Sequence, residues 1–85
     1  MDKFTVMPQS INHNESPAFV ANWFSGDEVQ ENREEDSFYY EADGGLGQLL
    51  ICRIKWQDEK PQPEEYNYLM DRAIVAIDNW ISERM

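Results

Sequence analysis

The chain has 85 residues, with 17 Asp and Glu against 7 Lys and Arg, and a formal net charge of −10. This length fits one domain, and a charge so negative disfavours binding to nucleic acid or to an anionic membrane and favours basic protein surfaces. The aromatic content of 13% is too high for a disordered acidic tail, so we expect a single folded domain over residues 1–85 with a small aromatic core.

Cys52 is the single cysteine, so no intramolecular disulfide can form, and this composition fits a reducing compartment. The residues from Met1 to Phe4 do not combine a basic segment with an apolar stretch, and we expect no signal peptide. No apolar run approaches the ~20 residues that a membrane-spanning helix needs. The sequence therefore predicts a cytoplasmic protein that does not bind a membrane.

At the N-terminal end, the weak alternation of polar and apolar residues from Lys3 to Met7 predicts a short strand. Pro8 is expected to end this strand or to hold it at a sheet edge. Residues 11–15 are polar and are predicted to form a loop.

A short helix is expected over about residues 17–24. Ser16 can cap its free N–H groups, and Pro17 suits the first helical position. Gly26 is a plausible stop, because glycine readily takes a positive φ. The helix prediction depends on four apolar residues at helical spacing: Phe19, Val20, Trp23 and Phe24.

Two strands joined by a hairpin turn are predicted next, because residues 37–42 and 48–56 are rich in aromatic and β-branched side chains. The glycine-rich stretch 43–47 predicts the turn rather than a phosphate-binding loop, since a strand follows it and Asp43 would repel phosphate. Alternation gives the second strand two faces, one of which becomes basic toward its end. The other face is the core candidate: Leu50, Cys52, Ile54 and Trp56.

A long amphipathic helix over about residues 64–84 is the clearest element of the sequence. Pro63 suits its start, and Glu64 and Glu65 lie in the first turn, where the helix dipole favours carboxylates. The fold class is therefore α+β: a small antiparallel sheet, made of the hairpin at about 37–56 and a short N-terminal strand, packed against this helix. The apolar stripe that faces the sheet is Tyr66, Leu69, Met70, Ala73, Ile74, Ile77 and Ile81.

The acidic segment from Asp27 to Asp43 is the main candidate site. Its first part holds one apolar residue, Val29, and fits a solvated loop better than an exposed helical turn. Carboxylates in such an array can occupy Lys and Arg side chains that otherwise contact phosphates, or they can simply keep the protein soluble. The candidate residues are Asp27, Glu28, Glu31, Glu34, Glu35, Asp36, Glu41 and Asp43, helped by a stripe of Glu64, Asp71 and Asp78 on the long helix.

Catalytic and metal chemistry find little support in the sequence. His13 is the sole histidine, lies in a polar stretch and is expected at the surface, whereas Cys52 is expected to be buried and structural. A nucleophilic pair would need the two side chains to meet in the fold, and a zinc site would need more ligands. The acidic run does not match the spacing of a calcium loop. We expect no catalytic residue, no metal and no cofactor.

These observations predict a small, acidic, non-enzymatic inhibitor that occludes the basic surface of a nucleic-acid-handling protein, in the manner of a DNA mimic, without binding nucleic acid itself. In size, charge and lack of catalytic motifs the chain resembles small acidic phage proteins that disarm host nucleases, which implies an anti-defence role; no residue is carried over. The alternatives are an immunity protein or antitoxin that neutralises a basic toxin, and, in a different class, a small assembly subunit, such as a homodimer, or an enzyme subunit.

Overall fold

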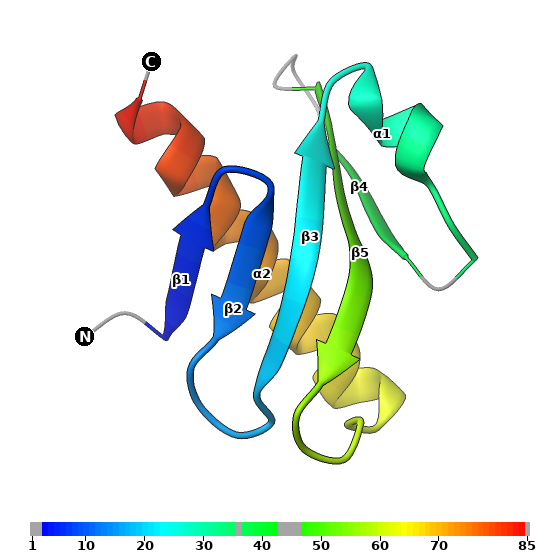
Figure 1. Cartoon of the computed structure of the whole chain (residues 1–85), viewed down its shortest axis with the longest axis vertical. Coiled ribbons are helices and arrows are strands. Elements are labelled where there is room, and N and C mark those ends of the chain that lie inside the picture. Colours follow the sequence, from blue (N-terminus) through cyan, green and yellow to red (C-terminus); the bar gives the residue numbers. More distant parts are fainter. Residues whose placement is uncertain (1–2, 36, 43–46, 85) are drawn as a thin grey trace.

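The structure, a computed structural model, describes residues 3–35, 37–42 and 47–84. These residues form five strands and two helices, which lie in two main layers (Figure 1). The fold is therefore α+β, as predicted. In chain order the elements are β1 (Phe4–Met7), β2 (Ser10–His13), β3 (Phe19–Ser25), α1 (Glu28–Asn32), β4 (Phe38–Ala42), β5 (Gly47–Trp56) and α2 (Pro63–Glu83).

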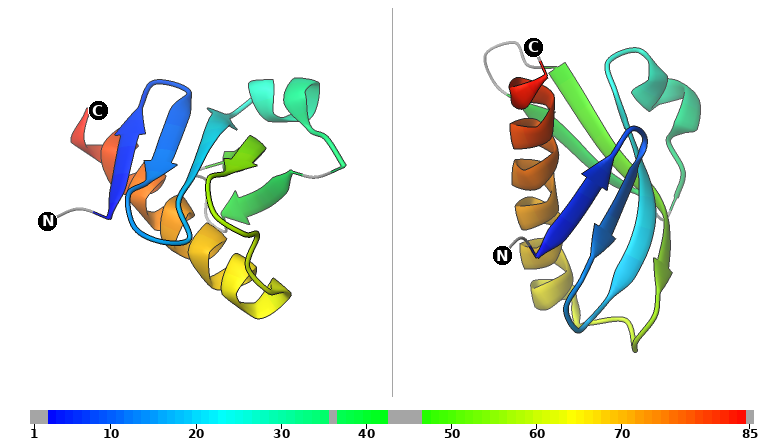
Figure 2. Two further views of the ribbon diagram at one scale, coloured as in Figure 1. Left: turned by 60° about the horizontal axis from the view of Figure 1, so that its bottom comes forward. Right: turned by 60° about the vertical axis from the view of Figure 1, so that its left-hand side comes forward.

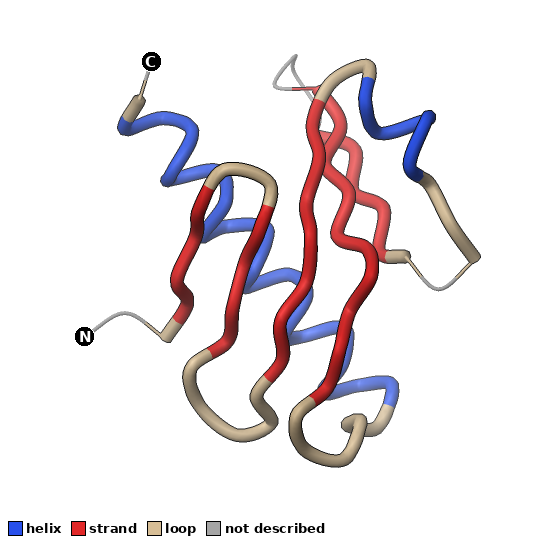
Figure 3. The backbone as a smooth tube through the Cα atoms, in the orientation of Figure 1, coloured by secondary structure: helices blue, strands red, loops and turns tan. Residues whose placement is uncertain are grey.

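All five strands belong to one antiparallel sheet with the order β1-β2-β3-β5-β4. The chain leaves β3, crosses through α1 to the edge strand β4, and returns as β5 between β3 and β4 (Figure 3). The antiparallel pairing of β4 with β5 and the N-terminal strand β1 confirm the predicted strands. Residues 43–46 of the predicted turn lie outside the described residues. The edges of the sheet are β1 and β4.

The long helix α2 covers one face of the sheet (Figure 2). Its stripe packs against Leu49 and Ile51 of β5, and the ring of Trp80 lies 5.6 Å from that of Trp23 in β3. Its bounds confirm the predicted helix to within one residue at each end. No helix in the described part of the chain combines the length and the hydropathy needed to cross a membrane. The helix residues that are buried are Leu69, Met70, Ala73, Ile74 and Ile77.

The opposite face of the sheet carries a second, smaller apolar cluster. Adjacent residues of a strand point to opposite faces, so Leu50 and Cys52 point away from α2. Both are fully buried there together with Val29 of α1, and Phe24 and Tyr39 pack around them. The helix α1 therefore covers part of the face that α2 leaves open (Figure 2).

A bulge in β5 changes which of its residues face α2. Asn22 of β3 pairs with Cys52 and Val20 pairs with Lys55, so that Arg53 and Ile54 stand opposite the single residue between them. Arg53 adopts a φ of +52°. The bulge shifts the alternation by one residue, as such insertions do. The core face predicted for β5 is therefore wrong before the bulge, where Leu49 and Ile51 face α2 and Leu50 and Cys52 belong to the other cluster. It is confirmed after the bulge, where Ile54 and Trp56 face α2.

The predicted helix over 17–24 is also wrong, because residues 19–24 belong to the central strand β3 and residues 17 and 18 precede it. Phe19, Ala21 and Trp23 alternate toward α2 and are buried, and β2 and β5 pair with the strand on both sides. This strand carries apolar residues on both faces, because α2 covers one face and α1 covers part of the other. Its apolar residues therefore follow one another in adjacent pairs, which resembles the spacing of a helix.

Two predicted loops contain regular structure. Residues 11–15, predicted as a loop, contribute to β2, where Ile11 and His13 are buried at alternate positions. The start of the acidic segment forms the short helix α1 rather than a loop, because burial of Val29 fixes one turn against the sheet. In both places tertiary contacts override a polar local sequence.

Candidate functional site

The short helix α1 is the centre of the acidic segment, and one apolar residue fixes it. Gly26 turns the chain out of β3 with a φ of +62°, and its carbonyl oxygen accepts a hydrogen bond from the N–H of Val29 at 3.2 Å. Val29 is fully buried against the second cluster. A helix of five residues is not stable alone. Its carboxylates therefore depend on Val29 for a fixed position above the sheet.

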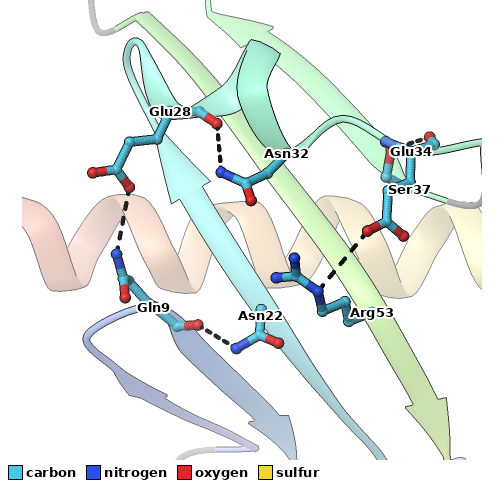
Figure 4. Close-up of polar contacts among 7 residues, drawn as sticks. All are labelled: Gln9, Asn22, Glu28, Asn32, Glu34, Ser37 and Arg53. Atoms are coloured by element: carbon cyan, nitrogen blue, oxygen red, sulfur yellow. Dashed lines mark hydrogen bonds and ion pairs between the residues drawn. The ribbon is translucent and has the colours of Figure 1, made fainter.

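Polar contacts join α1 to the turn between β1 and β2 (Figure 4). Nε2 of Gln9 donates to Oε2 of Glu28 at 3.4 Å, and Nδ2 of Asn32 donates to the backbone oxygen of Glu28 at 2.9 Å. The backbone oxygen of Gln9 accepts from Nδ2 of Asn22 at 2.9 Å. Gln9 adopts a φ of +65° after Pro8, the pattern of a type II turn. This turn thus supports both β3 and the start of α1.

The loop that follows α1 in the acidic segment is joined to the bulge of β5. Oε1 of Glu34 lies 3.9 Å from Nε of Arg53 (Figure 4). The guanidinium of Arg53 also lies 5.8 Å from the ring centre of Phe24. The hydroxyl of Ser37 donates to the backbone oxygen of Glu34 and accepts from its N–H, which closes a tight turn before β4. Glu34 is thereby held on the same side of the sheet as α1.

Carboxylates dominate this side of the molecule. The two guanidinium groups beside them are already engaged: Arg33 lies 4.2 Å over the ring of Tyr39, and Arg53 contacts Phe24 and Glu34. In the described part of the chain, one carboxylate of this set, that of Glu34, forms an ion pair. We call the set the α1 surface; all its members are exposed, and they are Asp27, Glu28, Glu31, Glu34, Glu35 and Glu41.

The predicted site residues do not form one continuous array. Asp36 and Asp43 lie outside the described residues. Glu64, Asp71 and Asp78 lie along α2, and α2 is on the other side of the sheet from α1 (Figure 2). Because the sheet separates the two sets, a partner that contacts the α1 surface across a flat interface does not reach the stripe on α2.

The outer face of α2 is also less purely acidic than its stripe suggests. Tyr68 and Val75 are 61% and 56% exposed, respectively. Arg72 lies 5.8 Å from the ring centre of Tyr68 and adds a positive charge to this face. The α1 surface is thus the better match to a simple anionic array.

His13 and Cys52 do not form a pair, since they lie on opposite faces of the sheet. The prediction of a surface histidine is wrong: His13 is buried beside Phe4 and Phe19, and its Nδ1 lies 2.9 Å from the backbone oxygen of Pro17. The prediction of a buried Cys52 is confirmed. Burial raises the pKa of the Cys52 thiol, Arg53 opposes this shift and Glu34 adds to it. Among the described residues, no group of acidic, histidine or cysteine side chains is placed to hold a metal ion.

Hollows on the described surface include one that is remote from the α1 surface and one that Glu34 of that surface helps to line. One of about 440 Å³ lies between β1 and the end of α2, where Phe4 and Trp80 form apolar walls and Lys3 and Glu83 lie at the rim. The other, of about 290 Å³, lies beside the second half of β5 and includes Arg53.

Three residues of this region were not predicted from the sequence: Gln9, Tyr39 as a support for Arg33, and Arg53. The pair Pro8-Gln9 is a recognisable turn signal, whereas nothing local marks Arg53 as a bulge. Comparison with protein families, with curated proteins and with solved structures gives no match for this chain.

Proposed function

We propose that this chain is a non-enzymatic binding protein whose α1 surface docks on a basic protein surface and blocks it. The partner class that fits is a protein that handles nucleic acid, because such proteins expose Lys and Arg to contact phosphates. Occupation of those side chains by carboxylates would exclude DNA or RNA from the same surface. The partner and the blocked ligand would compete directly.

The observation that carries the proposal is the lack of charge compensation on the α1 surface. Of its carboxylates, that of Glu34 is paired with Arg53, and the structure gives no cationic partner to the others among the described residues. Neighbouring uncompensated charges repel one another and weaken the fold. A basic partner would relieve that repulsion, so part of the binding free energy comes from charge that is unfavourable in the free protein.

The arrangement also supports a fixed array rather than a flexible acidic tail. Val29 anchors α1, a contact to Gln9 holds Glu28 at its start, and a contact to Arg53 holds Glu34 in the loop after it. Because the carboxylates are positioned before binding, association loses less conformational entropy than it would with a disordered segment.

The experiment that tests this function is capture from a nuclease-treated bacterial lysate followed by a competition assay. We expect one dominant nucleic-acid-binding protein that is released only at high salt and that loses its DNA or RNA when this chain is added. A captured basic toxin without nucleic acid would instead favour the immunity-protein alternative. A captured protein that keeps its nucleic acid while bound to this chain would contradict occlusion.

A second candidate function, an assembly subunit, is favoured by the exposed apolar side chains of α2. Tyr68 and Val75 are 61% and 56% exposed, respectively, on one helix face. Exposed aromatic residues with a polar surround often anchor protein interfaces. Light scattering over a range of concentrations separates the two: a defined homo-oligomer that Tyr68→Glu dissociates favours assembly, and a monomer at all concentrations does not.

A further inference from the structure

β5 is an inner strand of the sheet, but its second half has an open edge on one side. The edge strand β4 pairs with residues Gly47 to Ile51 only, whereas β5 continues to Trp56. On its other side β5 stays paired with β3 as far as Trp56. Among the described residues, therefore, no strand pairs with the second half of β5 on the β4 side (Figure 3).

The backbone of this half of β5 points its hydrogen-bonding groups outward at alternate residues. The N–H of Gln57 donates to the backbone oxygen of Ala18 at 2.8 Å, and Lys55 is paired with Val20. Groups of residues two apart point to the same side of a strand, so those of Ile54 and Trp56 point away from β3. They are directed at the open edge, where an added strand could bind them.

A hollow of about 290 Å³ lies beside this edge. Ile54, Trp56 and Tyr66 supply apolar surface, and the rings of Trp56 and Tyr66 lie 6.1 Å apart. Two cations, Arg53 and Lys60, line the same hollow.

The charge of this hollow is unusual for the chain. Among the described residues that line it, the one carboxylate is that of Glu34, which is already paired with Arg53. Lys55 adds an exposed cation on the same half-strand. Because the charges of Arg53 and Glu34 cancel, the surplus positive charge among the described residues of this edge comes from Lys55 and Lys60, in a protein of net charge −10.

We propose that the open edge of β5, residues 52–56, binds an extended peptide of alternating acidic and apolar residues as an added strand. Its apolar side chains would lie on the α2 side, against Ile54, Trp56 and Tyr66. Its carboxylates would lie on the other side, where Arg53 and Lys55 meet them, with Lys60 at the end of the hollow. Main-chain hydrogen bonds supply affinity in such strand addition, and alternate side chains supply specificity.

A second copy of this chain is the less suitable occupant. Pairing of two β5 edges would bring together Arg53, Lys55 and Lys60 of both copies, and like charges across a strand pair are unfavourable. The acidic peptide complements these cations instead. Glu34 belongs to the α1 surface and also lines this hollow, but the other residues of the hollow are distinct from that surface. The inference does not depend on the proposed function.

The test uses the full chain and a capped synthetic peptide of alternating glutamate and valine, about eight residues long. Amide NMR spectra of the protein are recorded as the peptide is added. We expect the largest shifts at the amides of Ile54 and Trp56, with both amides becoming protected from hydrogen exchange. A peptide of alternating lysine and valine is the matched control and is expected to bind at least about fivefold more weakly.

Two variants test the role of the cations without disturbing the fold. Arg53→Gly removes one charge at a positive φ that glycine favours, and Lys60→Glu reverses an exposed charge. Each is expected to lower the affinity for the acidic peptide by about twofold to fivefold, which is the size of effect that an exposed ion pair gives. Arg72→Glu on the outer face of α2 is the control and should leave binding unchanged.

Three results would overturn the proposal. The first is that the amides of residues 52–56 do not shift even at the highest peptide concentration, or that amides of β1 or β4 shift in their place. The second is equal affinity of the acidic and basic peptides. The third is a concentration-dependent shift of the same amides in the protein alone, which would assign the edge to a second copy.

Discussion

The carboxylate of Glu34 lies 3.9 Å from the guanidinium of Arg53, and this contact joins the acidic segment to the bulge of β5. Both side chains are 49% exposed, so the pair contributes only about 0–1 kcal/mol to stability. Its effect is positional: it holds the end of the α1 surface over the sheet. The carboxylates around it stay available to a partner.

Val29→Ala should destabilise the protein by about 2 kcal/mol, because it removes two buried methyl groups and leaves a cavity under α1. Val75→Ala is the matched control, since Val75 is 56% exposed, and it should stay within about 0.5 kcal/mol of the wild type. Urea unfolding of both variants checks the difference. Equal stability of the two would show that α1 is not anchored by Val29.

Arg53→Gly should be more stable than Arg53→Ala by about 1 kcal/mol. Both variants lose the same contacts to Glu34 and Phe24, but only glycine adopts a φ of +52° without a steric cost. Thermal unfolding of the two variants side by side measures this steric cost less the larger backbone entropy that glycine loses on folding. An alanine variant as stable as the glycine variant would contradict the bulge.

Ile74→Asp should unfold the domain or cost at least about 3 kcal/mol, because it places an unpaired charge under α2, where Ile74 is 5% exposed. Val75→Asp changes the next residue on the exposed face and should cost less than about 1 kcal/mol. Circular dichroism during heating compares the two. If the two variants melt together, the buried face of α2 has been assigned wrongly.

The contribution of Cys52 to the stability of the fold should fall at alkaline pH. Burial raises the pKa of this thiol in the folded state, so as the pH rises past its ordinary value of 9.0 the unfolded chain loses the proton first. Proton loss then favours the unfolded state, and the stability present below pH 9.0 is lost as the pH approaches the raised pKa.

The measurement is the free energy of unfolding of the wild type and of Cys52→Ala, from neutral pH to above the ordinary pKa of the thiol. Taking the difference between the two proteins removes every pH-dependent contribution that they share. The difference between them should shrink as the pH rises. A constant difference would mean that the thiol titrates equally in both states.

The parts of the fold that were predicted from the sequence are those with a strong local pattern. The stripe of α2 has a clear helical periodicity, and β4 and β5 are rich in aromatic and β-branched side chains, so the helix and the paired strands could be located. Trp23 and Phe24 show the limit: they lie on opposite faces of a central strand, and this pairing depends on β2 and β5 at distant sequence positions. Local spacing alone could not separate that strand from a helix.

The candidate site was predicted in composition but not in arrangement. The carboxylates from Asp27 to Glu35 could be identified by their density alone. Glu64 and Asp71 lie on the other side of the sheet because α1 and α2 pack on opposite faces of it (Figure 2). No local sequence pattern indicates this packing. Arg53 was missed because the bulge preserves an apparent alternation through Ile54 and Trp56.

The most direct test of the α1 surface is to compare two double variants with the same change in net charge. Glu31→Lys with Glu35→Lys changes the α1 surface, and Glu64→Lys with Asp71→Lys changes the outer face of α2; all four residues are exposed. Affinity for the partner captured from lysate is measured for both at several salt concentrations. We expect the first pair to weaken binding by about 2 kcal/mol or more and to reduce its salt dependence, and the second pair to keep most of the affinity. Equal loss from both pairs, or loss from the α2 pair alone, would contradict the assignment of binding to the α1 surface.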